Sequence, residues 1–389
     1  MNICFYYIND PEPTCGGIER VCLNLIPELQ KSHSIFFCCL HQRRAVPMDN
    51  VVMYPLPDPS EPSSENNCQH LKRFIVENQI DVLLAHSYTH NPICDKAVDG
   101  TKCRLIYAFH CEPRCAGLGA FDVLASQKYA AMAGGCLLPY IYSLLKLPIS
   151  YLVRNYRMAE CLNKMYDASH ILVFLSERFL PIYKKYSRKN NIERARAIPN
   201  PVPPIHKTID YGKKKKQVLV VSRMEIIHKR VDRILYIWHR VQSDFPDWEL
   251  ILLGSGPQLS FFQELATKLG LKRISFKGAV DAFSYYEEAS ILCLTSSAEG
   301  FGMVLAEAQQ HGCVPIAYDS YASVRDIITH GENGLLVPPF RERTYAKLLS
   351  RLMSDHKARE RMGKNGEQTV QKFHPEAIAE KWNALFSSL

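Results

Sequence analysis

Short apolar segments alternate along nearly the whole chain with longer segments in which apolar residues recur every three or four positions. The short segments are typical of buried strands and the longer ones of helices. In the first half, strands are expected at residues 3–8, 35–40, 82–85, 105–109 and 171–174. In the second half, they are expected at residues 217–222, 249–253, 274–277, 291–294 and 314–317. This alternation predicts an α/β protein with two doubly wound parallel sheets.

A segment rich in proline and lysine separates the two series of strands. Residues 198–204 contain four prolines, and residues 213–216 are an unbroken run of lysine. This composition is typical of a linker, and a chain of 389 residues is long enough for two cores. We predict an N-terminal domain over 1–200, a linker over 201–216 and a C-terminal domain over 217–389, whose last helix either stays there or returns to the N-terminal domain.

The composition is that of an ordinary globular protein, and its positive charge is unevenly placed. The chain is 47% apolar and 22% charged, with a formal net charge of +8. Residues 141–196 alone carry 11 basic and 4 acidic side chains. A basic field attracts anions such as lipid headgroups, phosphorylated substrates or nucleic acid. Because no RNA-binding motif or helix-turn-helix signature is present, we do not expect nucleic acid as a partner.

The longest uncharged stretch lies beside this basic region. Residues 129–145 are shorter than a usual membrane span, and a proline interrupts them. This pattern is typical of helices with an apolar and a basic face, either packed in a core or lying on a membrane surface. In the second case the cations that follow would meet anionic lipid on the membrane or acceptor side; they are Lys146, Arg154, Arg157 and Lys164.

The cysteines and histidines do not form a metal-binding pattern. The 14 cysteines lack the spacing of zinc sites, and His86 and His90 have the helical i, i+4 spacing without a third ligand nearby. The first residues include neither a basic region nor a long apolar one, so no signal peptide is expected. We therefore predict reduced thiols, no bound metal and a cytoplasmic protein, either free or peripheral on the cytoplasmic face of a membrane.

Candidate chemistry is concentrated in residues 296–308, which follow a strand and open a helix. Gly300 and Gly302 free the backbone to bring the first-turn amides of that helix against a diphosphate, whose charge the helix dipole favours. Glu299 precedes the helix and can reach a sugar, while Glu307 can accept hydrogen bonds from ribose hydroxyls or face solvent.

Two further groups follow predicted strands. Arg223 comes directly after the strand at 217–222, and Lys229 and Arg230 precede the next helix, where cations could neutralise a departing diphosphate. Gly16 and Gly17 form the turn after the first strand, either to approach a ligand closely or to make a tight turn. Residues 254–257 lack the third glycine of a dinucleotide-binding motif and are interpreted as a structural turn.

Taken jointly, these features resemble the retaining glycosyltransferases of family 4, which have the two-domain GT-B fold. The resemblance spans most of the chain and rests on Gly16–Gly17, His110 after a strand, Ser-Glu-Arg-Phe at 176–179, Ile-Pro-Asn-Pro at 198–201, Arg223 with Lys229, Glu299 with Glu307, and 331–337. It implies two Rossmann-like doubly wound domains that face each other across a cleft. The residues at 318–323 are similar to those of transferases that build bacterial surface polysaccharides.

The resemblance also implies roles for individual residues. Arg223 and Lys229 would bind the donor diphosphate, Glu299 the donor sugar and Glu307 the ribose. The amides of Phe301, Gly302 and Met303, next to Gly300, would bind phosphate or sugar, and His110 would contact the sugar or support the reaction centre. The loop with Gly16 and Gly17 would lie over the phosphates. Family members place the lysine five residues after the arginine, whereas Lys229 is six residues after it, which leaves open whether Lys229 or Arg230 meets the diphosphate.

The expected reaction is a metal-independent transfer, with retention, of a hexose or N-acetylhexosamine from a nucleotide sugar, by resemblance UDP-linked. The acceptor would be a glycan or lipid-linked oligosaccharide in lipopolysaccharide, capsule or exopolysaccharide biosynthesis, and no cofactor is implied. A sugar-nucleotide 2-epimerase shares the fold and is one alternative. A non-catalytic scaffold that binds nucleotide sugars is the other.

Overall fold

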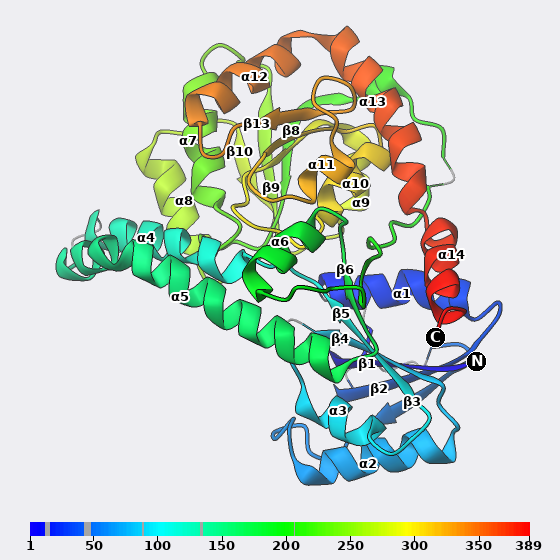
Figure 1. Ribbon diagram of the computed structural model, residues 1–389. Helices are drawn as coiled ribbons and strands as arrows, with labels where there is room; N and C mark the ends of the chain where they lie inside the picture. The colour runs from blue at the N-terminus through cyan, green and yellow to red at the C-terminus, as the bar shows by residue number, and fades with distance from the viewer. Residues whose placement is uncertain (12–15, 43–47, 88, 133–134, 206) are drawn as a thin grey trace. The chain divides into compact units, whose positions relative to one another are not determined.

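The chain forms two compact units, each built around one parallel sheet (Figure 1). The computed structural model describes residues 1–11, 16–42, 48–87, 89–132, 135–205 and 207–389. The first unit comprises Met1–Pro113, Tyr156–Pro203 and Lys372–Leu389, and the second comprises Arg114–Asn155 and Pro204–Gln371. The predicted class, an α/β protein with two Rossmann-like doubly wound domains, is confirmed.

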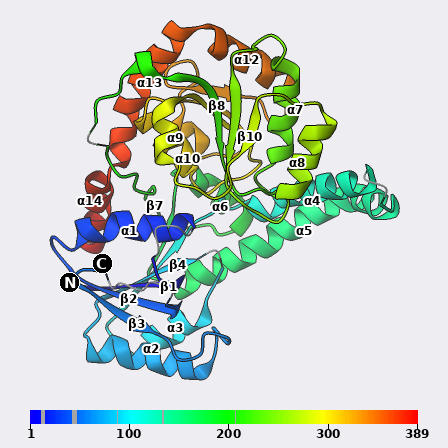
Figure 2. The ribbon, with the colours of Figure 1, turned by 180° about the vertical axis from the view of Figure 1, so that it is seen from behind.

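The first unit contains a seven-stranded parallel sheet with the order β3-β2-β1-β4-β5-β6-β7. Its strands are β1 Asn2–Asn9, β2 Ser34–His41, β3 Val51–Pro55, β4 Val82–Ser87, β5 Arg104–Phe109, β6 Ile171–Phe174 and β7 Ala195–Ala197. Its helices are α1 Gly17–Leu29, α2 Glu65–Glu77, α3 Pro92–Val98, α6 Phe179–Ser187, α14 Pro375–Phe386 and the last part of α5. Helix α1 covers one face of the sheet and α2 and α3 cover the other (Figures 1 and 2). Trp382 and Phe386 of α14 join the core beneath α1.

The second unit contains a six-stranded parallel sheet with the order β10-β9-β8-β11-β12-β13. Its strands are β8 Lys215–Val221, β9 Glu249–Leu253, β10 Ile274–Phe276, β11 Ala289–Leu294, β12 Val314–Tyr318 and β13 Leu335–Val337. Its helices include α7 Val231–Val241, α8 Leu259–Lys268, α9 Phe283–Glu288, α10 Met303–Gln310, α11 Val324–Ile327, α12 Glu342–Ser354 and α13 His356–Val370. Trp238, Trp248 and Tyr345 fill the core between the sheet and α7, α8 and α12.

All ten predicted strands are present, and the structure adds three that the apolar pattern did not indicate. These are β3, β7 and β13, each of which lies at an edge of its sheet. An edge strand pairs on one side only, so it needs fewer apolar residues than a central one. The turn at 254–257 has a packing role, because a Cβ on Gly254 would lie 1.9 Å from the carbonyl oxygen of Ser222.

Two long helices, α4 Cys115–Met132 and α5 Leu138–Ala168, lie side by side in both views (Figures 1 and 2). Phe121 of α4 meets Tyr151 of α5 with ring centroids 5.8 Å apart, and Tyr129 packs on Phe261 of α8 at 5.4 Å. These contacts explain why Arg114–Asn155 belongs to the second unit, although the sequence pattern assigned residues 1–200 to one N-terminal domain. Among the helices of the described residues, none has both the length and the apolar character that crossing a membrane requires.

Candidate functional site

The loops that follow β8 and β11 meet, because these two strands are neighbours in the parallel sheet. Leu219 pairs with Leu292 in the register of the two strands. Beyond the strands, the amide of Ser297 donates to the carbonyl oxygen of His228 at 2.7 Å, and the Thr295 hydroxyl donates to that of Arg230 at 3.0 Å. The carboxyl ends of neighbouring parallel strands are the usual place for ligand-binding residues in such sheets. The two loops are therefore joined into one rim in the second unit.

A lysine and a glutamate face each other on this rim. Lys229 Nζ donates to both carboxylate oxygens of Glu299, at 2.7 and 2.8 Å, and the Ser296 hydroxyl donates to the first oxygen at 2.7 Å. The two side chains keep 19% and 13% of their surface exposed, so that a ligand can reach them. His228 and Arg230 on either side of the lysine both have left-handed backbone, with φ of 66° and 51°. Such strained residues are typical of functional loops.

Helix α10 begins at Met303, four residues beyond Glu299. Gly302 caps the helix with a φ of +92°, which favours glycine, and its cap position has no side-chain hydrogen bond. The Ser323 hydroxyl donates to the carbonyl oxygen of Gly300 at 3.0 Å, and the Ser320 hydroxyl donates to that of Ser296 at 2.7 Å. These serines, from the segment after β12, hold the loop in place. The partial positive charge of a helix N-terminus thus lies beside the carboxylate and ammonium groups.

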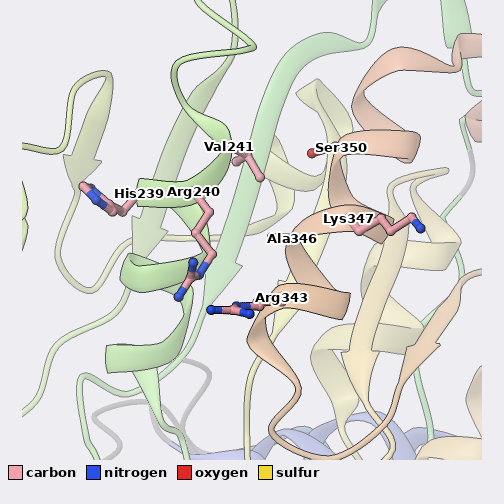
Figure 3. Close-up of a pocket in the computed structure, with 7 residues that line it drawn as sticks. All are labelled: His239, Arg240, Val241, Arg343, Ala346, Lys347 and Ser350. Atoms are coloured by element: carbon pink, nitrogen blue, oxygen red, sulfur yellow. The ribbon is translucent and has the colours of Figure 1, made fainter.

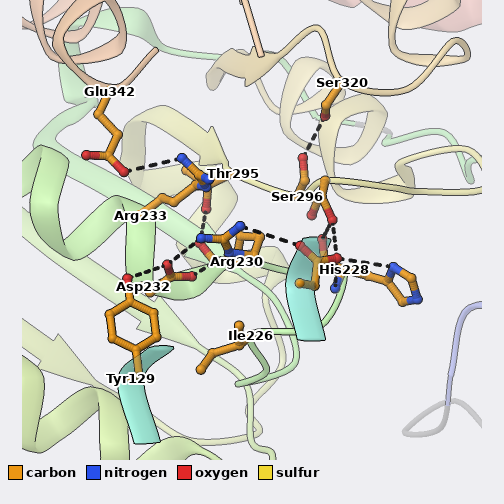
Figure 4. A network of polar contacts seen from close by, with 12 residues as sticks. Tyr129, Ile226, His228, Arg230, Asp232, Arg233, Thr295, Ser296, Ser320 and Glu342 are labelled. Atoms are coloured by element: carbon orange, nitrogen blue, oxygen red, sulfur yellow. Dashed lines mark hydrogen bonds and ion pairs between the residues drawn. The ribbon is translucent and has the colours of Figure 1, made fainter. Parts of the chain in front are cut away.

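The two neighbouring cations Lys229 and Arg230 differ in burial and in their partners. Figure 4 shows Arg230 beside Asp232 and Tyr129. Arg230 is 6% exposed, and its guanidinium donates to both carboxylate oxygens of Asp232 at 3.0 and 2.9 Å. The Tyr129 hydroxyl donates to the same carboxylate at 2.8 Å. Arg230 is therefore a buried structural cation. Lys229 is the one of the two that a ligand can reach.

Arg223 is the more open cation of this region. Its side chain is 67% exposed and forms an ion pair with Glu225 at 3.3 Å. Burial lowers the pKa of His228; Asp122 and Glu299 raise it, and the positive charges of Lys229 and Arg223 lower it further. Arg223 therefore acts electrostatically on His228, as Lys229 and Glu299 do.

Asp122 is a functional-site residue that the sequence analysis missed. It is fully buried on α4, where it accepts hydrogen bonds from the His228 amide at 2.9 Å and the Ser297 hydroxyl at 2.6 Å. It also lies 3.5 Å from the Arg230 guanidinium. One carboxylate thus ties α4 to both loops. In the sequence, Asp122 could have been noticed because it is the single charged residue within residues 115–127.

Glu307 lies inside the second unit, not at the solvent-facing position that the sequence also allowed. It is 2% exposed, and one of its carboxylate oxygens accepts a hydrogen bond from the Tyr286 hydroxyl at 3.0 Å. Phe301 is buried as well, whereas Gly300 and Met303 are partly exposed. A ribose hydroxyl would have to share the Glu307 carboxylate with Tyr286.

Three further predicted site residues lie in the first unit: His110, predicted as catalytic, and Gly16 and Gly17, predicted to bind the donor. His110 is buried after β5, and its Nε2 lies 2.7 Å from Nδ1 of His86, whose ring stacks on Phe5. Burial lowers the pKa of His86 to about 3, and burial together with the His86 charge lowers that of His110. Two neutral rings can share one N–H as donor and acceptor. Gly16 and Gly17 are exposed at the start of α1.

The four cations predicted for the membrane or acceptor side all lie on α5 and are exposed; they are Lys146, Arg154, Arg157 and Lys164. A separate open hollow of about 470 Å³ lies between α7 and α12 in the second unit (Figure 3). Its lining includes Arg240 and Arg343 but none of the predicted site residues. Within the described ranges, no three or more histidine, cysteine, aspartate or glutamate side chains are grouped so that they could hold a metal ion.

The segment that contains this rim is similar in sequence to known proteins. Residues 203–369 match the family model of the glycosyl transferases group 1. The chain is 32% identical over 199 residues to an exopolysaccharide phosphotransferase of Streptomyces coelicolor, which covers 50% of this chain and 21% of that protein. It is 27% identical over 177 residues to an α-1,4-N-acetyl-D-galactosaminyltransferase of Campylobacter jejuni, which covers 45% and 49%. The chain thus spans about half or less of the length of these two relatives.

The whole chain is similar in fold to a solved structure. The crystal structure of HepE from Anabaena in complex with UDP-glucose superposes with a TM-score of 0.74 at 17% identity and covers 100% of both chains. The resemblance to glycosyltransferases indicated by the sequence is therefore confirmed for residues 203–369, and the predicted fold is confirmed for the whole chain.

Replacing Asp122 by alanine should destabilise the second unit. The change removes the buried partner of two loops and leaves Arg230 with less compensating charge, so we expect a loss on the order of 3 kcal/mol in the free energy of unfolding. Asp319→Ala is the matched control, because its ion pair with Arg325 lies at the surface and should be worth less than about 1 kcal/mol. Denaturant unfolding measures both. Equal losses in the two variants would contradict the structural role of Asp122.

The buried His86 should make the protein sensitive to mild acid. Above pH 6.5 His86 is neutral in both folded and unfolded states, whereas between pH 6.5 and 3 only the unfolded state takes up the proton. Stability therefore falls as the pH falls through this window, by about 2 kcal/mol from His86 alone at pH 5. Unfolding of His86→Gln should depend less steeply on pH, and the exposed control His356→Gln should behave like the original chain. The same steepness in His86→Gln would show that His86 titrates normally.

Proposed function

We propose that this chain, whose residues 203–369 match the family model of the glycosyl transferases group 1, transfers a hexose or N-acetylhexosamine from a nucleotide sugar to a glycan or lipid-linked acceptor. The observation that carries the proposal is the accessible pair of Lys229 and Glu299 beside the start of α10. An ammonium group and helix amides suit a diphosphate, and a carboxylate suits sugar hydroxyls. A donor that bears both groups would bind all three features at once.

The donor nucleotide in this proposal is UDP. The similarity in fold to a protein crystallised with UDP-glucose supports it. Arg223 and Lys229 would take the diphosphate, together with the amides of Phe301, Gly302 and Met303. We assign Lys229 rather than Arg230 because Arg230 is buried and bonded to Asp232. Glu307 would accept a ribose hydroxyl beside its bond from Tyr286.

The proposed reaction proceeds with retention of configuration and without a metal. The bond between the sugar C1 and the phosphate oxygen breaks while the acceptor oxygen attacks C1 from the same face, and the leaving phosphate takes the acceptor proton. Arg223, Lys229 and the α10 amides supply positive charge to the leaving diphosphate, which is the task that a divalent metal performs elsewhere. Glu299 orients the sugar and stabilises its developing charge. His110, neutral at pH 7, would contact the sugar as a hydrogen-bond partner.

The acceptor is proposed to be part of a bacterial cell-surface polysaccharide. The names of the two relatives support this class, one as an exopolysaccharide enzyme and one acting on an oligosaccharide linked to diphospho-undecaprenol. A lipid-linked acceptor would be met at the cytoplasmic face of a membrane. The exposed cations of α5 would then lie near anionic lipid.

Glu299→Ala should lower the transfer rate by about a hundredfold or more, since it removes a preorganised electrostatic stabiliser. UDP release from UDP-hexoses and UDP-N-acetylhexosamines, with undecaprenyl-diphosphate-linked sugar as acceptor, measures the rate, and proton NMR gives the anomeric configuration of the product. The exposed Glu264→Ala on α8 is the control and should be unaffected.

We expect a retained configuration and an unchanged rate in EDTA. Near-normal turnover by Glu299→Ala would refute the role of that residue, and an inverted product or inhibition by EDTA would refute the mechanism. Conversion of the donor to its 2-epimer without acceptor would identify an epimerase instead.

A further inference from the structure

Helix α5 exposes a continuous apolar stripe to solvent. The residues follow one another at alternating spacings of four and three, which places them on one side of a helix. Their exposed fractions range from 58% to 75%; the residues are Leu138, Tyr142, Leu145, Ile149, Leu152 and Tyr156, here called the α5 stripe. Single exposed apolar residues are common, but an unbroken row of six large ones marks an interaction surface.

The opposite side of α5 is the one that packs within the protein. Tyr151 contacts Phe121 of α4, and Asn155 is buried where it approaches Gly117 so closely that a Cβ there would lie 2.2 Å from its amide oxygen. The stripe is therefore turned away from α4. Helix α5 begins at Leu138 and runs beside α4 in both views (Figures 1 and 2).

The charge around the stripe is positive. Lys146, Arg157 and Lys164 follow one another at spacings of 11 and 7, so they line one flank of the stripe. From Leu138 to Tyr156 the helix carries no acidic side chain, and Glu160, one turn further on, forms an ion pair with Lys164 at 3.5 Å. Arg154 is the exception among the predicted cations, because it lies over Gly119 of α4 instead. An apolar face with a cationic flank complements a surface that is apolar inside and anionic at its rim.

We propose that the α5 stripe docks on an anionic lipid bilayer, with α5 lying in the plane of the membrane interface. The leucine and isoleucine side chains enter the boundary between headgroups and acyl chains, where Tyr142 and Tyr156 keep their hydroxyls at the headgroup level. Lys146, Arg157 and Lys164 contact lipid phosphates. This docking deepens the proposed function and rests on it, because a lipid-linked acceptor would be met at this membrane surface.

A second copy of the chain is a less suitable occupant. The four-and-three spacing also suits pairing of two helices. If two copies paired through the stripe, their cationic flanks would lie in one interface, and the stripe segment has no acidic side chain to pair with them. Like charges in an interface are destabilising. An anionic membrane has the opposite charge.

Flotation with vesicles tests the proposal without any substrate. The full chain is mixed with vesicles of phosphatidylcholine alone or with added phosphatidylglycerol, at low and high salt. Three variants are compared with it: Leu145→Glu with Ile149→Glu in the stripe, Lys146→Gln with Arg157→Gln in the flank, and Val52→Glu with Val76→Glu as the control. Val52 and Val76 are exposed apolar residues of the first unit, at 50% and 59%. Thermal unfolding shows that each variant is folded.

The original chain and the control should float with anionic vesicles. The stripe variant should lose about tenfold or more in apparent affinity at both salt concentrations, because it loses apolar insertion. The flank variant should lose affinity mainly at low salt. If the stripe variant floats as well as the control, the proposal is overturned. It is also overturned if sedimentation shows that the original chain is a dimer and that the stripe variant is a monomer. UDP binding, measured on the same variants, should be unchanged, so a failure of docking is distinguished from a failure of the donor site.

Discussion

The parallel pairing of β8 with β11 is the constraint on which the candidate site depends. It sets two loops side by side that are about 70 residues apart in the chain, and the Lys229 and Glu299 side chains meet as a consequence. Strand order, not sequence proximity, therefore creates the site. The bonds from Ser297 to His228 and from Thr295 to Arg230 then fix the loops to each other.

This rim is built from groups with different burial, and the difference decides what each can do. Arg230, Asp232 and Asp122 are almost fully buried, so their charges are satisfied by one another and cannot be offered to a ligand. Removing one partner of such a set is costly. Lys229 and Glu299 keep 19% and 13% of their side-chain surface exposed, so a ligand can reach both groups. The pair can therefore exchange its partners for those of a ligand while the buried set keeps the loops in place.

The central strands could be predicted from the sequence, because buried strands are apolar. The Glu-Gly-Phe-Gly segment follows one of these strands, and the structure brings its Glu299 to Lys229, while the donor-binding role of the two residues stays a prediction. The edge strand β7 could not, since it is three residues long and pairs on one side only. Asp122 was missed because its partners lie more than 100 residues away, and only the fold brings them together. The burial of Glu307 against Tyr286 and the pairing of His110 with His86 depend on tertiary packing in the same way.

Ligand-dependent thermal unfolding tests the central claim, a nucleotide diphosphate site on the β8 and β11 loops, most directly. The protein is heated with UDP, GDP or ADP, and the same series is repeated with Arg223→Ala and Lys229→Met. One nucleotide, expected to be UDP, should stabilise the original chain by about 2.7 kcal/mol at a hundred times its Kd, and both variants should lose most of that gain. Stabilisation by none of the three, or an equal gain in the variants, would contradict the assignment of the site.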